Sequence, residues 1–598
     1  MGFSWRFLCF LKYISMICVL PVINSVDIDS VTDKVFENEG REINGVLAAF
    51  GDFNSDKLID LFFILESGTS FGIYFASERE PIFNSAPNIV CKFHDGLLVT
   101  SIVPGDYNGD NKMDVLFTLR DSDKTKIETT VKILEGNLTT LKSCEKPVLR
   151  ITNMSVEPVV LDYNGDMIPD LYGETVDGVR RVWIMNRLNW TYRNESIKVV
   201  KKIRPIHSNA FVNLDNDVAA DIFVTTTDKM YEIWLNEAGV YKEDALEPFP
   251  DAQVIGQSAF LDIDLDGNLD HIVPVCYNQE CTNTTIFVRR NFNSSSGEWI
   301  PVSGSFILDD GIHWGFYKTD SYPITLHVGD YNLDGYPDLL TIICYNDTAR
   351  EAVILENSSC KGCQFKRRFK VNRLFKDVKN VILAAFYDIY QDGNLDFIFV
   401  TQNPATKNYN ISAYQNKVES DVCFLKILVL SGLVNVKKVP AYGVNQPGPF
   451  ISYRTTQLDG SPQRSCAAQL SQSAHFALQL PYTVFGLGQT PNFVDELVVG
   501  IPQSENFSKE VSMKTWKTII PNSQMIIVPF RNDEQHTIKW YSLLFVKPFS
   551  HQVLIALIAL VGTCALIILI IGGLHWKEKI ADKKEKLQEA HKFHFDAM

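Results

Sequence analysis

A nine-residue acidic pattern that recurs seven times constrains the fold of this chain more than any other feature of its sequence. Asp or Asn stands at position 1, an acid or an amide at position 3 in six of the copies, and Asp at positions 5 and 9. The first residues of the outermost copies, Asp52 and Asp388, lie 336 residues apart, so that the six steps have a mean length of 56. A fixed period of this length is typical of repeat architectures, in which each repeat is one supersecondary unit.

The residue types in this pattern are those that bind calcium. A calcium ion takes about six to eight oxygen ligands, and a tight loop turns the side chains at positions 1, 3 and 5 toward one centre. The carboxylate at position 9 closes the site from the following strand. We therefore predict structural calcium held, in chain order, by Asp52, Asn54, Asp56 and Asp60; Asp106, Asn108, Asp110 and Asp114; Asp162, Asn164, Asp166 and Asp170; Asn213, Asp215, Asp217 and Asp221; Asp262, Asp264, Asp266 and Asp270; Asp330, Asn332, Asp334 and Asp338; and Asp388, Asp392 and Asp396.

Short apolar runs rich in β-formers flank each copy, for example residues 46–50 and 61–65 around the first. This context predicts a β-hairpin whose turn holds the metal. About 56 residues accommodate four strands, which is one propeller blade, and seven blades close into a ring without exposed sheet edges. We predict an all-β chain, with a seven-bladed propeller over residues 26–420 and a small β-rich domain over residues 421–548. EF-hands are excluded because no copy has Glu at position 12, and a calcium-binding parallel β-helix would have a period of about nine residues.

The seven copies, numbered here as loops 1 to 7, differ in their suitability for calcium. Position 6 requires a positive φ and prefers Gly, which stands there in loops 5, 6 and 7, with an acceptable Asn in loop 2. Lys57, Met167 and Val218 are unfavourable at this position. Asn213 removes a charge at position 1 of loop 4, and Tyr390 removes the position-3 ligand of loop 7. We therefore rank loops 2, 5 and 6 first and loops 4 and 7 last, with a metal-free Asx turn as the alternative in the poorer loops.

Both ends of the chain carry an apolar segment. An apolar run after Arg6 predicts a secretory signal peptide over residues 1–25, for which a membrane anchor is the alternative. Residues 553–574 contain no charged side chain and are long enough to cross a bilayer. Five Lys follow directly, so by the positive-inside rule residues 575–598 form a cytoplasmic tail. We predict a single-pass type I protein of the cell membrane, with its ectodomain extracellular or lumenal.

Two further features agree with the secretory pathway. Sequons for N-linked glycans occur on the predicted extracellular side at Asn137, Asn153, Asn189, Asn194, Asn283, Asn293, Asn346, Asn357, Asn410 and Asn506. Nine cysteines lie in the same part of the chain, where an oxidising compartment would pair most of them. Proximity pairs Cys91 with Cys144, Cys276 with Cys281, Cys360 with Cys363 and Cys423 with Cys466, and leaves Cys344 over. Redox or zinc chemistry of Cys360 and Cys363 is the alternative to a structural disulfide.

Catalytic chemistry is not expected. The histidines of the predicted ectodomain are scattered, and none shows the His-x-x-x-His spacing of a zinc hydrolase: His94, His207, His271, His313, His327, His475 and His536. The acidic residues are already assigned to calcium. The net charge of −15 fits this assignment, because seven calcium ions would offset most of it, and no basic partner such as a nucleic acid is needed to explain it. We predict that the chain is not an enzyme.

Some copies carry the residues of a known repeat. Phe50-Gly51-Asp52 and Gly105-Asp106 resemble the FG-GAP repeats of integrin α-subunit propellers. The order of signal peptide, seven repeats, membrane-proximal β-rich domain, span and short tail resembles the T-cell immunomodulatory protein (linkin) family over nearly the full chain. Within the second domain, residues 469–499 resemble the small module that follows FG-GAP repeats in secreted cartilage-type proteins.

The resemblance implies a function at the cell surface. It implies a modulator of T-cell function with a role in cell adhesion or signalling, which binds a protein ligand through the loop-rich faces of the propeller. It also implies contacts of the tail with tubulin or RuvB-like ATPases, although no tail residue carries this implication. A carbohydrate-binding propeller of the secretory pathway is the alternative. That alternative would place exposed aromatic side chains at one position of every blade, and the sequence has no such regular placement.

Overall fold

The computed structural model describes most of the 598 residues, namely 26–37, 43, 45–93, 96–123, 128–198, 201–290, 297–304, 306–308, 311–346, 349–418, 422–433, 443–489, 493–502, 512–529, 540–546 and 550–595. The predicted signal peptide lies outside these residues. The chain divides into one compact unit that ends at Phe545 and a second unit from Val546 onward.

Seven sheets carry one acidic loop each, always between the innermost strand and its neighbour. The first four sheets are β2 (Gly45–Gly51), β3 (Asp60–Leu65), β4 (Ser70–Tyr74) and β5 (Ile89–Lys92); β6 (Leu97–Gly105), β7 (Asp114–Asp121), β8 (Thr129–Leu134) and β9 (Leu149–Met154); β10 (Val159–Leu161), β11 (Asp170–Glu174), β12 (Arg180–Met185) and β13 (Tyr192–Ile197); and β14 (Ala210–Val212), β15 (Asp221–Thr225), β16 (Met230–Glu237) and β17 (Val240–Pro248).

The remaining three sheets of this set have the same plan with additional short strands. They are β18 (Val254–Ile255), β19 (Ala259–Leu261), β20 (Asp270–Cys276), β21 (Thr284–Arg289) and β22 (Ile300–Pro301); β23 (Phe306–Ile307), β24 (His313–Phe316), β25 (His327–Gly329), β26 (Asp338–Asn346), β27 (Ala349–Ser359) and β28 (Arg367–Asn372); and β29 (Val381–Tyr387), β30 (Asp396–Gln402), β31 (Tyr409–Val418) and β1 (Val26–Ser30). The short helices α2 (Thr32–Val35) and η1 (Glu66–Gly68) lie in connections.

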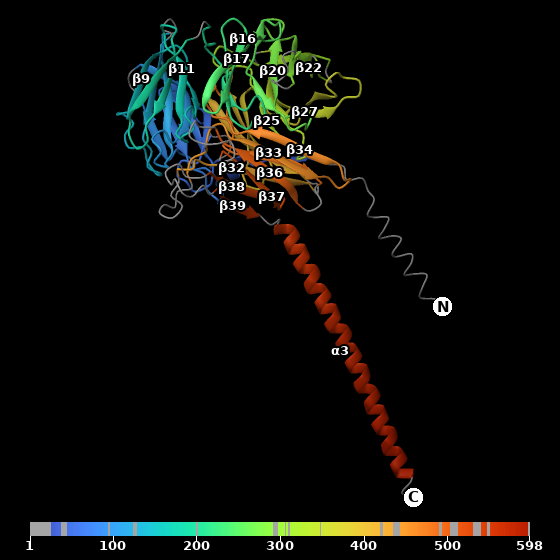
Figure 1. Ribbon diagram of the computed structural model, residues 1–598. Coiled ribbons are helices and arrows are strands. Elements are labelled where there is room, and N and C mark those ends of the chain that lie inside the picture. The colour runs from blue at the N-terminus through green and yellow to red at the C-terminus, as the bar shows by residue number, and fades with distance from the viewer. Residues whose placement is uncertain are drawn as a thin grey trace. The chain divides into compact units, whose positions relative to one another are not determined.

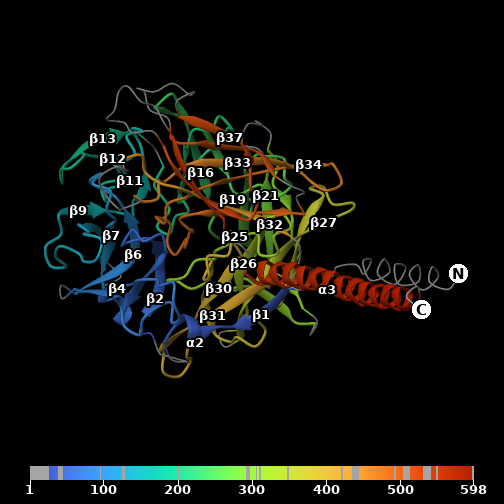
Figure 2. The same ribbon diagram turned by 90° about the horizontal axis from the view of Figure 1, so that it is seen from below.

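These sheets form a β-propeller, as predicted. Every boundary between consecutive sheets holds a cluster of buried apolar side chains, including the boundary between the last sheet and the first. Burial falls from the inner to the outer strands, because β2 is fully buried whereas β13 is almost fully exposed. Figure 2 shows the sheets following one another around a common axis.

The ring is closed by strands from the two ends of the repeat region. The N-terminal strand β1 pairs antiparallel with β31, from Val26 opposite Val418 to Ser30 opposite Tyr414. At the next boundary, Phe50 of the first sheet stacks on Tyr387 of the last, with 5.6 Å between the ring centroids. The closure therefore depends on contacts between residues more than 300 positions apart, which loop-closure entropy opposes until the whole ring has formed.

A second β domain follows the ring and belongs to the same compact unit. Its two four-stranded sheets have the order β35-β32-β38-β39 and β34-β33-β36-β37. The strands are β32 (Cys423–Val429), β33 (Phe450–Thr456), β34 (Pro462–Ala468), β35 (Thr483–Gly488), β36 (Val494–Gly500), β37 (Met513–Ile519), β38 (Ser523–Val528) and β39 (Tyr541–Val546). Leu425 and Ile427 of β32 pack in the core between the sheets, together with Leu497 and Val499 of β36.

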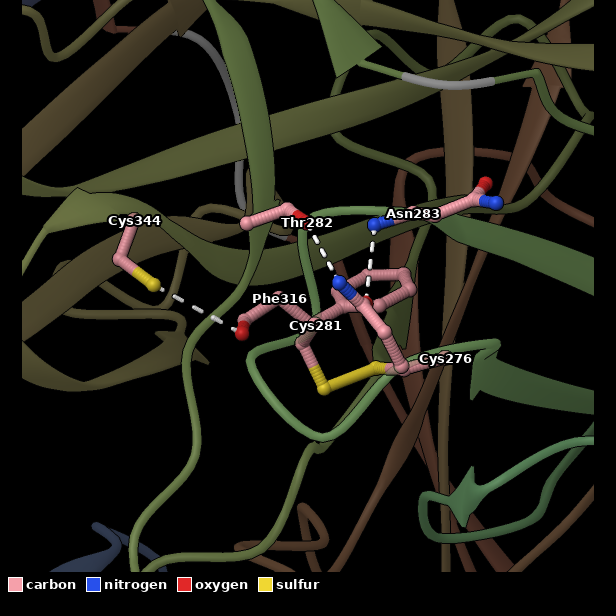
Figure 3. The surroundings of a disulfide bond; sticks show 7 residues. Cys276, Cys281, Thr282, Asn283, Phe316 and Cys344 are labelled. Atoms are coloured by element: carbon pink, nitrogen blue, oxygen red, sulfur yellow. Dashed lines mark hydrogen bonds between the residues drawn. A yellow bond between two sulfur atoms is a disulfide. The ribbon is translucent and has the colours of Figure 1, made fainter.

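Three of the four predicted disulfides are confirmed. Cys91 bonds Cys144, Cys276 bonds Cys281, and Cys360 bonds Cys363. The second of these closes the turn between β20 and β21, and the thiol of Cys344 on β26 points toward the carbonyl of Phe316 rather than toward another cysteine (Figure 3).

The predicted Cys423–Cys466 disulfide is wrong. Cys466 is buried among apolar side chains, and Cys423 lies beside the amide of Asn522, at 3.7 Å. Cys423 begins β32 and Cys466 lies within β34, which belong to different sheets, so their proximity in the sequence did not bring them together in the fold.

The second unit contains one long helix, α3 (Ser550–Phe595). Residues Leu557–Gln588 include a stretch apolar enough to cross a membrane, with a hydropathy of 2.8 and no burial inside the protein. This helix fits the predicted single-pass membrane protein. It extends beyond the predicted span of 553–574 into the predicted tail, because the tail residues from Lys577 onward continue the same helix.

We predict that Phe50→Ala weakens ring closure. The Phe50 side chain is fully buried at the boundary between the first and last sheets, so its truncation should cost about 3–5 kcal/mol of unfolding free energy. Urea denaturation followed by tryptophan fluorescence measures this loss. Phe493→Ala is the control, because Phe493 is 47% exposed and its truncation should cost less than about 0.5 kcal/mol. Equal losses in the two variants would contradict the assigned closure.

Candidate calcium loops and the domain that covers them

All seven acidic loops lie at the same end of the sheets. Each connects the innermost strand of a sheet to the next strand, as loop 1 connects β2 to β3 and loop 7 connects β29 to β30. Because the sheets share one axis, the fold gathers the predicted ligands of all seven loops on one face of the ring. We call this the loop face.

The backbone of the loops is the same in all seven. Position 4 and position 6 have a positive φ throughout, and the φ at position 6 is 77° at Lys57, 70° at Met167 and 81° at Val218, compared with 80° at Gly267. Lys57, Met167 and Val218 were predicted to be unfavourable at position 6, yet all three adopt the positive φ that this position requires. They adopt the left-handed conformation at a cost of about 1–2 kcal/mol each, which the surrounding hydrogen bonds offset.

Positions 1, 3 and 5 converge through backbone hydrogen bonds. In loop 2, the Asp110 amide donates to Asp106 Oδ1 at 3.0 Å and to Asn108 Oδ1 at 2.9 Å, while the Asn111 amide donates to Asp106 Oδ2 at 2.8 Å. The bonds from positions 5 and 6 to the carboxylate at position 1 recur in loops 1, 3, 5, 6 and 7. The amides of positions 5 and 6 therefore hold the position-1 carboxylate in the same way in these six loops.

The Asp at position 9 has a structural role that the sequence analysis missed. In loop 2, Asp114 accepts a hydrogen bond from the Tyr107 amide at 3.1 Å and another from the Gly136 amide at 2.9 Å. Loops 1, 3, 4 and 7 repeat both bonds. The buried carboxylate thus joins its own loop to the end of the third strand, and it holds the blade together whether or not it also binds an ion.

The electrostatics of the loops fit a bound cation. Burial, together with the neighbouring carboxylates Asp110 and Asp266, raises the pKa of Asp106 and of Asp262 to about 7. In loop 5, carboxylate oxygens of Asp262, Asp264 and Asp270 lie within 4.8 Å of one another. Such clusters of acids are costly to ionise away from water unless a positive charge accompanies them.

Two buried carboxylate oxygens also fit a bound cation. Asp264 Oδ1 and Asp338 Oδ2 are buried and accept no hydrogen bond from the described part of the chain. The oxygen donors present in loops 1, 2, 3, 5 and 6 are thus of the kind that calcium takes, and loop 5 brings three carboxylates together.

Loops 4 and 7 depart from this pattern. In loop 4, Asn213 is fully buried, and neither oxygen nor nitrogen of its amide has a hydrogen-bond partner in the described residues. In loop 7, the ammonium of Lys426 lies 2.7 Å from Asp388 Oδ2, so the loop already contains a cation from the second domain. Lys426 was missed from the sequence, although a single Lys within the apolar run from Phe424 to Leu430 was a signal that could have identified it.

The second domain covers the loop face (Figure 1). Asn111 of loop 2 donates to the Leu433 carbonyl at 3.0 Å, and Gln446 donates to Asp162 Oδ2 of loop 3 at 2.9 Å. The Gly488 amide donates to the carbonyl of position 4 in loop 6 at 3.1 Å. Packing contacts add Val218 of loop 4 against Gly500, Gly267 of loop 5 against Arg464, and Gly393 of loop 7 against Phe424. In loop 1, the Lys57 ammonium lies 4.6 Å from the ring centroid of Phe545 on β39, so all seven loops contact one domain.

One part of the second domain, residues 469–482, enters the centre of the ring. Gln472 Oε1 accepts a hydrogen bond from the Phe50 amide at 2.8 Å, and its Nε2 donates to the Phe50 carbonyl. Gln257, which precedes β19 of the fifth sheet, donates to the His475 carbonyl at 2.9 Å. We call residues 469–482 the central segment. They belong to the stretch that resembles the module after FG-GAP repeats, and here they fill the ring axis.

The predicted glycan acceptors differ in accessibility. Asn137, Asn153, Asn189, Asn194 and Asn283 are exposed, and Asn410 is half-buried. The side chains of Asn293, Asn346 and Asn506 lie outside the described residues. Asn357 is 3% exposed and its amide donates to the Ile263 carbonyl at 3.0 Å, so the folded protein leaves no room for a glycan at this residue.

We predict that Gly486→Ala separates the second domain from loop 6. A Cβ at Gly486 would lie 2.0 Å from Asp330 Oδ2 and 2.6 Å from the Leu333 backbone, so one of the two must move. Limited proteolysis of the junction should accelerate, and the melting temperature should fall by several degrees. Gly304→Ala is the control, since nothing lies within 4 Å of its added Cβ. Identical digestion of the two variants would contradict the close approach.

The chain is similar in sequence to known proteins over both of its β domains. The sequence profile of the ITFG1 C2 domain matches residues 441–545, which lie within the second domain. T-cell immunomodulatory protein of Homo sapiens is 40% identical, over 95% of this chain and 94% of its own length. Protein linkin of Caenorhabditis elegans is 27% identical, over 97% of this chain and 100% of its own. Among solved structures, the N-terminal domain of Nup159 is 11% identical with a TM-score of 0.34, over 66% of this chain and 98% of that one.

The predicted family resemblance is therefore confirmed. The human relative exceeds a third identity along nearly the whole of both chains. From these matches, the chain belongs to the T-cell immunomodulatory protein family.

Proposed function

We propose that this chain is a single-pass glycoprotein of the cell surface whose ring, stabilised by calcium, binds a protein partner in cell adhesion or in signalling to T cells. The name of the human and rodent relatives supports the T-cell part of the proposal. The long apolar helix α3 supports attachment to a membrane.

The observation that carries the proposal is the division of the ring into a covered and an uncovered face. The second domain lies over the loop face, and its central segment fills the ring axis. The opposite face consists of turns between the second and third strands, where Val176 is 51%, Tyr277 42% and Tyr345 51% exposed. Turns on a rigid scaffold commonly carry binding, and exposed aromatic side chains commonly anchor protein interfaces.

The histidines support a non-enzymatic function. Burial lowers the pKa of His207 and of His327 to about 4, which leaves both rings neutral near pH 7. His207 Nε2 donates to the Glu157 carbonyl at 2.9 Å, and its Nδ1 accepts from the Asn209 amide at 3.2 Å. Both ring nitrogens are thus engaged in the fold, and neither is available as a general base.

The carbohydrate-binding alternative receives less support. At the turn position of Tyr277 and Tyr345, the other five sheets have Ser67, Asp121, Asp177, Asp228 and Asn403. A ring of aromatic platforms would require an aromatic residue in each sheet. The exposed tyrosines occur instead in two adjacent sheets, as expected of a single protein-binding patch.

Calcium is the proposed structural ion of loops 1, 2, 3, 5 and 6. We predict that chelation lowers the melting temperature of the full chain by several degrees, because an ion at 100 times its dissociation constant contributes about 2.7 kcal/mol per site. Differential scanning calorimetry with calcium and with a chelator measures the change. The variant Asp106→Asn/Asp110→Asn should lose part of the calcium-dependent shift, whereas Asp459→Asn, at an exposed acid outside the loops, should retain all of it. A calcium-independent transition in the unmodified chain would contradict the proposal.

We predict that the exposed turn residues Val176, Tyr277 and Tyr345 mediate binding to T cells. Cells that display the full chain should bind T cells, and the triple variant Val176→Ala/Tyr277→Ala/Tyr345→Ala should reduce the affinity roughly tenfold through loss of anchor contacts. A cell-adhesion assay in millimolar calcium measures this reduction. Leu458→Ala is the control, because Leu458 is 64% exposed but lies in the second domain.

Two outcomes would oppose this function. Equal adhesion of the triple variant and the parent chain would remove the patch from the proposal. Proximity labelling of intact cells that recovers only chaperones and residents of the endoplasmic reticulum would count against residence at the cell surface. Contacts of the tail with tubulin or RuvB-like ATPases remain part of the proposal, and a pull-down with residues 575–598 tests them.

A further inference from the structure

We infer that loop 7 binds no calcium and that the ammonium group of Lys426, supplied by the second domain, is its permanent cation. The Lys426 Nζ lies 2.7 Å from Asp388 Oδ2 and 2.8 Å from the side-chain oxygen of Gln391. It also lies 4.0 Å from the centre of the Tyr482 ring, within the range of a cation–π contact. Three groups of the ring and the central segment therefore surround one ammonium.

The pair is part of the buried junction and not a surface ion pair. Lys426 is 1% exposed and Asp388 is fully buried. By contrast, Lys112 and Arg290, which approach acids of loops 2 and 5, have side chains that are 33% and 49% exposed. A surface cation can move aside for an ion, whereas the Lys426 ammonium is buried between Asp388, Gln391 and Tyr482.

The backbone of Lys426 is held equally firmly. It lies on β32, an inner strand that pairs with β35 on one side and β38 on the other. Because side chains alternate along a strand, Phe424 and Lys426 point to the same side, and Phe424 packs on Gly393 at position 6 of loop 7. The strand therefore places one apolar and one charged side chain onto the same loop.

An ammonium and a calcium ion cannot share this loop. Calcium lies about 2.3–2.6 Å from its carboxylate oxygens, so an ion bound to Asp388 would be within about 5 Å of the Lys426 nitrogen. Two cations at that separation repel strongly in a buried site. Loop 7 also lacks the position-3 ligand, since Tyr390 extends toward Glu80 with 3.4 Å between its hydroxyl and the carboxylate.

The consequence is a link between the ring and the second domain that does not depend on calcium. Chelation would empty the other loops, whereas the Lys426–Asp388 pair would still hold the domain on the loop face. The ion count of this inference rests on the proposed binding of calcium by the other loops. The coupling between Lys426 and Asp388 does not.

The ion count is tested by native mass spectrometry of the full chain in detergent micelles with calcium. Asp388→Asn should bind as many calcium ions as the parent chain, and Asp106→Asn in loop 2 should bind one fewer. Loss of one ion from Asp388→Asn would overturn the inference. If Asp106→Asn also loses none, the proposed calcium function fails, and the pair is then judged by the coupling measured without calcium.

That coupling is measured as a double-mutant cycle of melting temperatures in excess chelator. Lys426→Met and Asp388→Asn should each lower the melting temperature by several degrees, because each leaves one unpaired polar partner in the junction. The double variant, which is neutral and similar in shape, should recover most of the loss. Losses that simply add in the double variant would overturn the inference.

The matched control is the surface pair of Lys417 and Asp29, whose side chains are 47% and 49% exposed. Lys417→Met, Asp29→Asn and their combination should show additive effects close to zero, as expected of a solvated ion pair. A coupling at this pair as large as that at Lys426 and Asp388 would show that the cycle reports a general effect of charge, and would also overturn the inference.

Discussion

The neutralisation of buried carboxylates between the ring and the second domain is the constraint on which the rest of this structure depends. Seven acidic loops converge on one face of the ring, and a second domain covers much of that face and buries several of their carboxylates. Carboxylates in such a place are tolerated only when they accept hydrogen bonds or accompany a cation. The protein uses several solutions: backbone amides at positions 5 and 6, an amide side chain from Gln446 in loop 3, and the ammonium of Lys426 in loop 7. Calcium is the proposed solution for the remaining charge.

The covered face and the filled axis together determine where a partner can bind. The central segment forms hydrogen bonds with Phe50 of the first sheet and Gln257 before β19 of the fifth, so it occupies the axis between these sheets. The second domain and the ring share hydrogen bonds, apolar clusters and a buried ion pair, which explains why they form one compact unit. Binding is therefore expected at the opposite face and at the outer strands, where the turns are exposed.

Local pattern predicted the repeating parts of the structure, and it failed where distant segments meet. The period of the acidic motif and the alternation of its flanking strands predicted the sheets and their order. Proximity in the sequence predicted three disulfides correctly. Two of them, with separations of 5 and 3 residues, each close a single connection, and Cys91–Cys144 joins β5 to the connection between β8 and β9. Proximity failed for Cys423 on β32 and Cys466 on β34, which form no disulfide with each other. The sequon at Asn357 is unsuitable because its side chain is buried by contacts with Ile263 of the neighbouring sheet and with Arg367 of its own sheet.

The sequence by itself determined the elements: the acidic turns, the strands around them, the apolar helix α3 and membership of the family, because each of these is encoded in short-range spacing. Only the tertiary structure decided how the acidic turns are completed. Lys426 reads locally as one charge in an apolar strand, and its partner lies 38 residues earlier in the chain, on the ring. The docking of the two domains decides which face of β32 meets the ring. The resulting contact between Lys426 and Asp388 distinguishes loop 7 from the loops for which calcium is proposed.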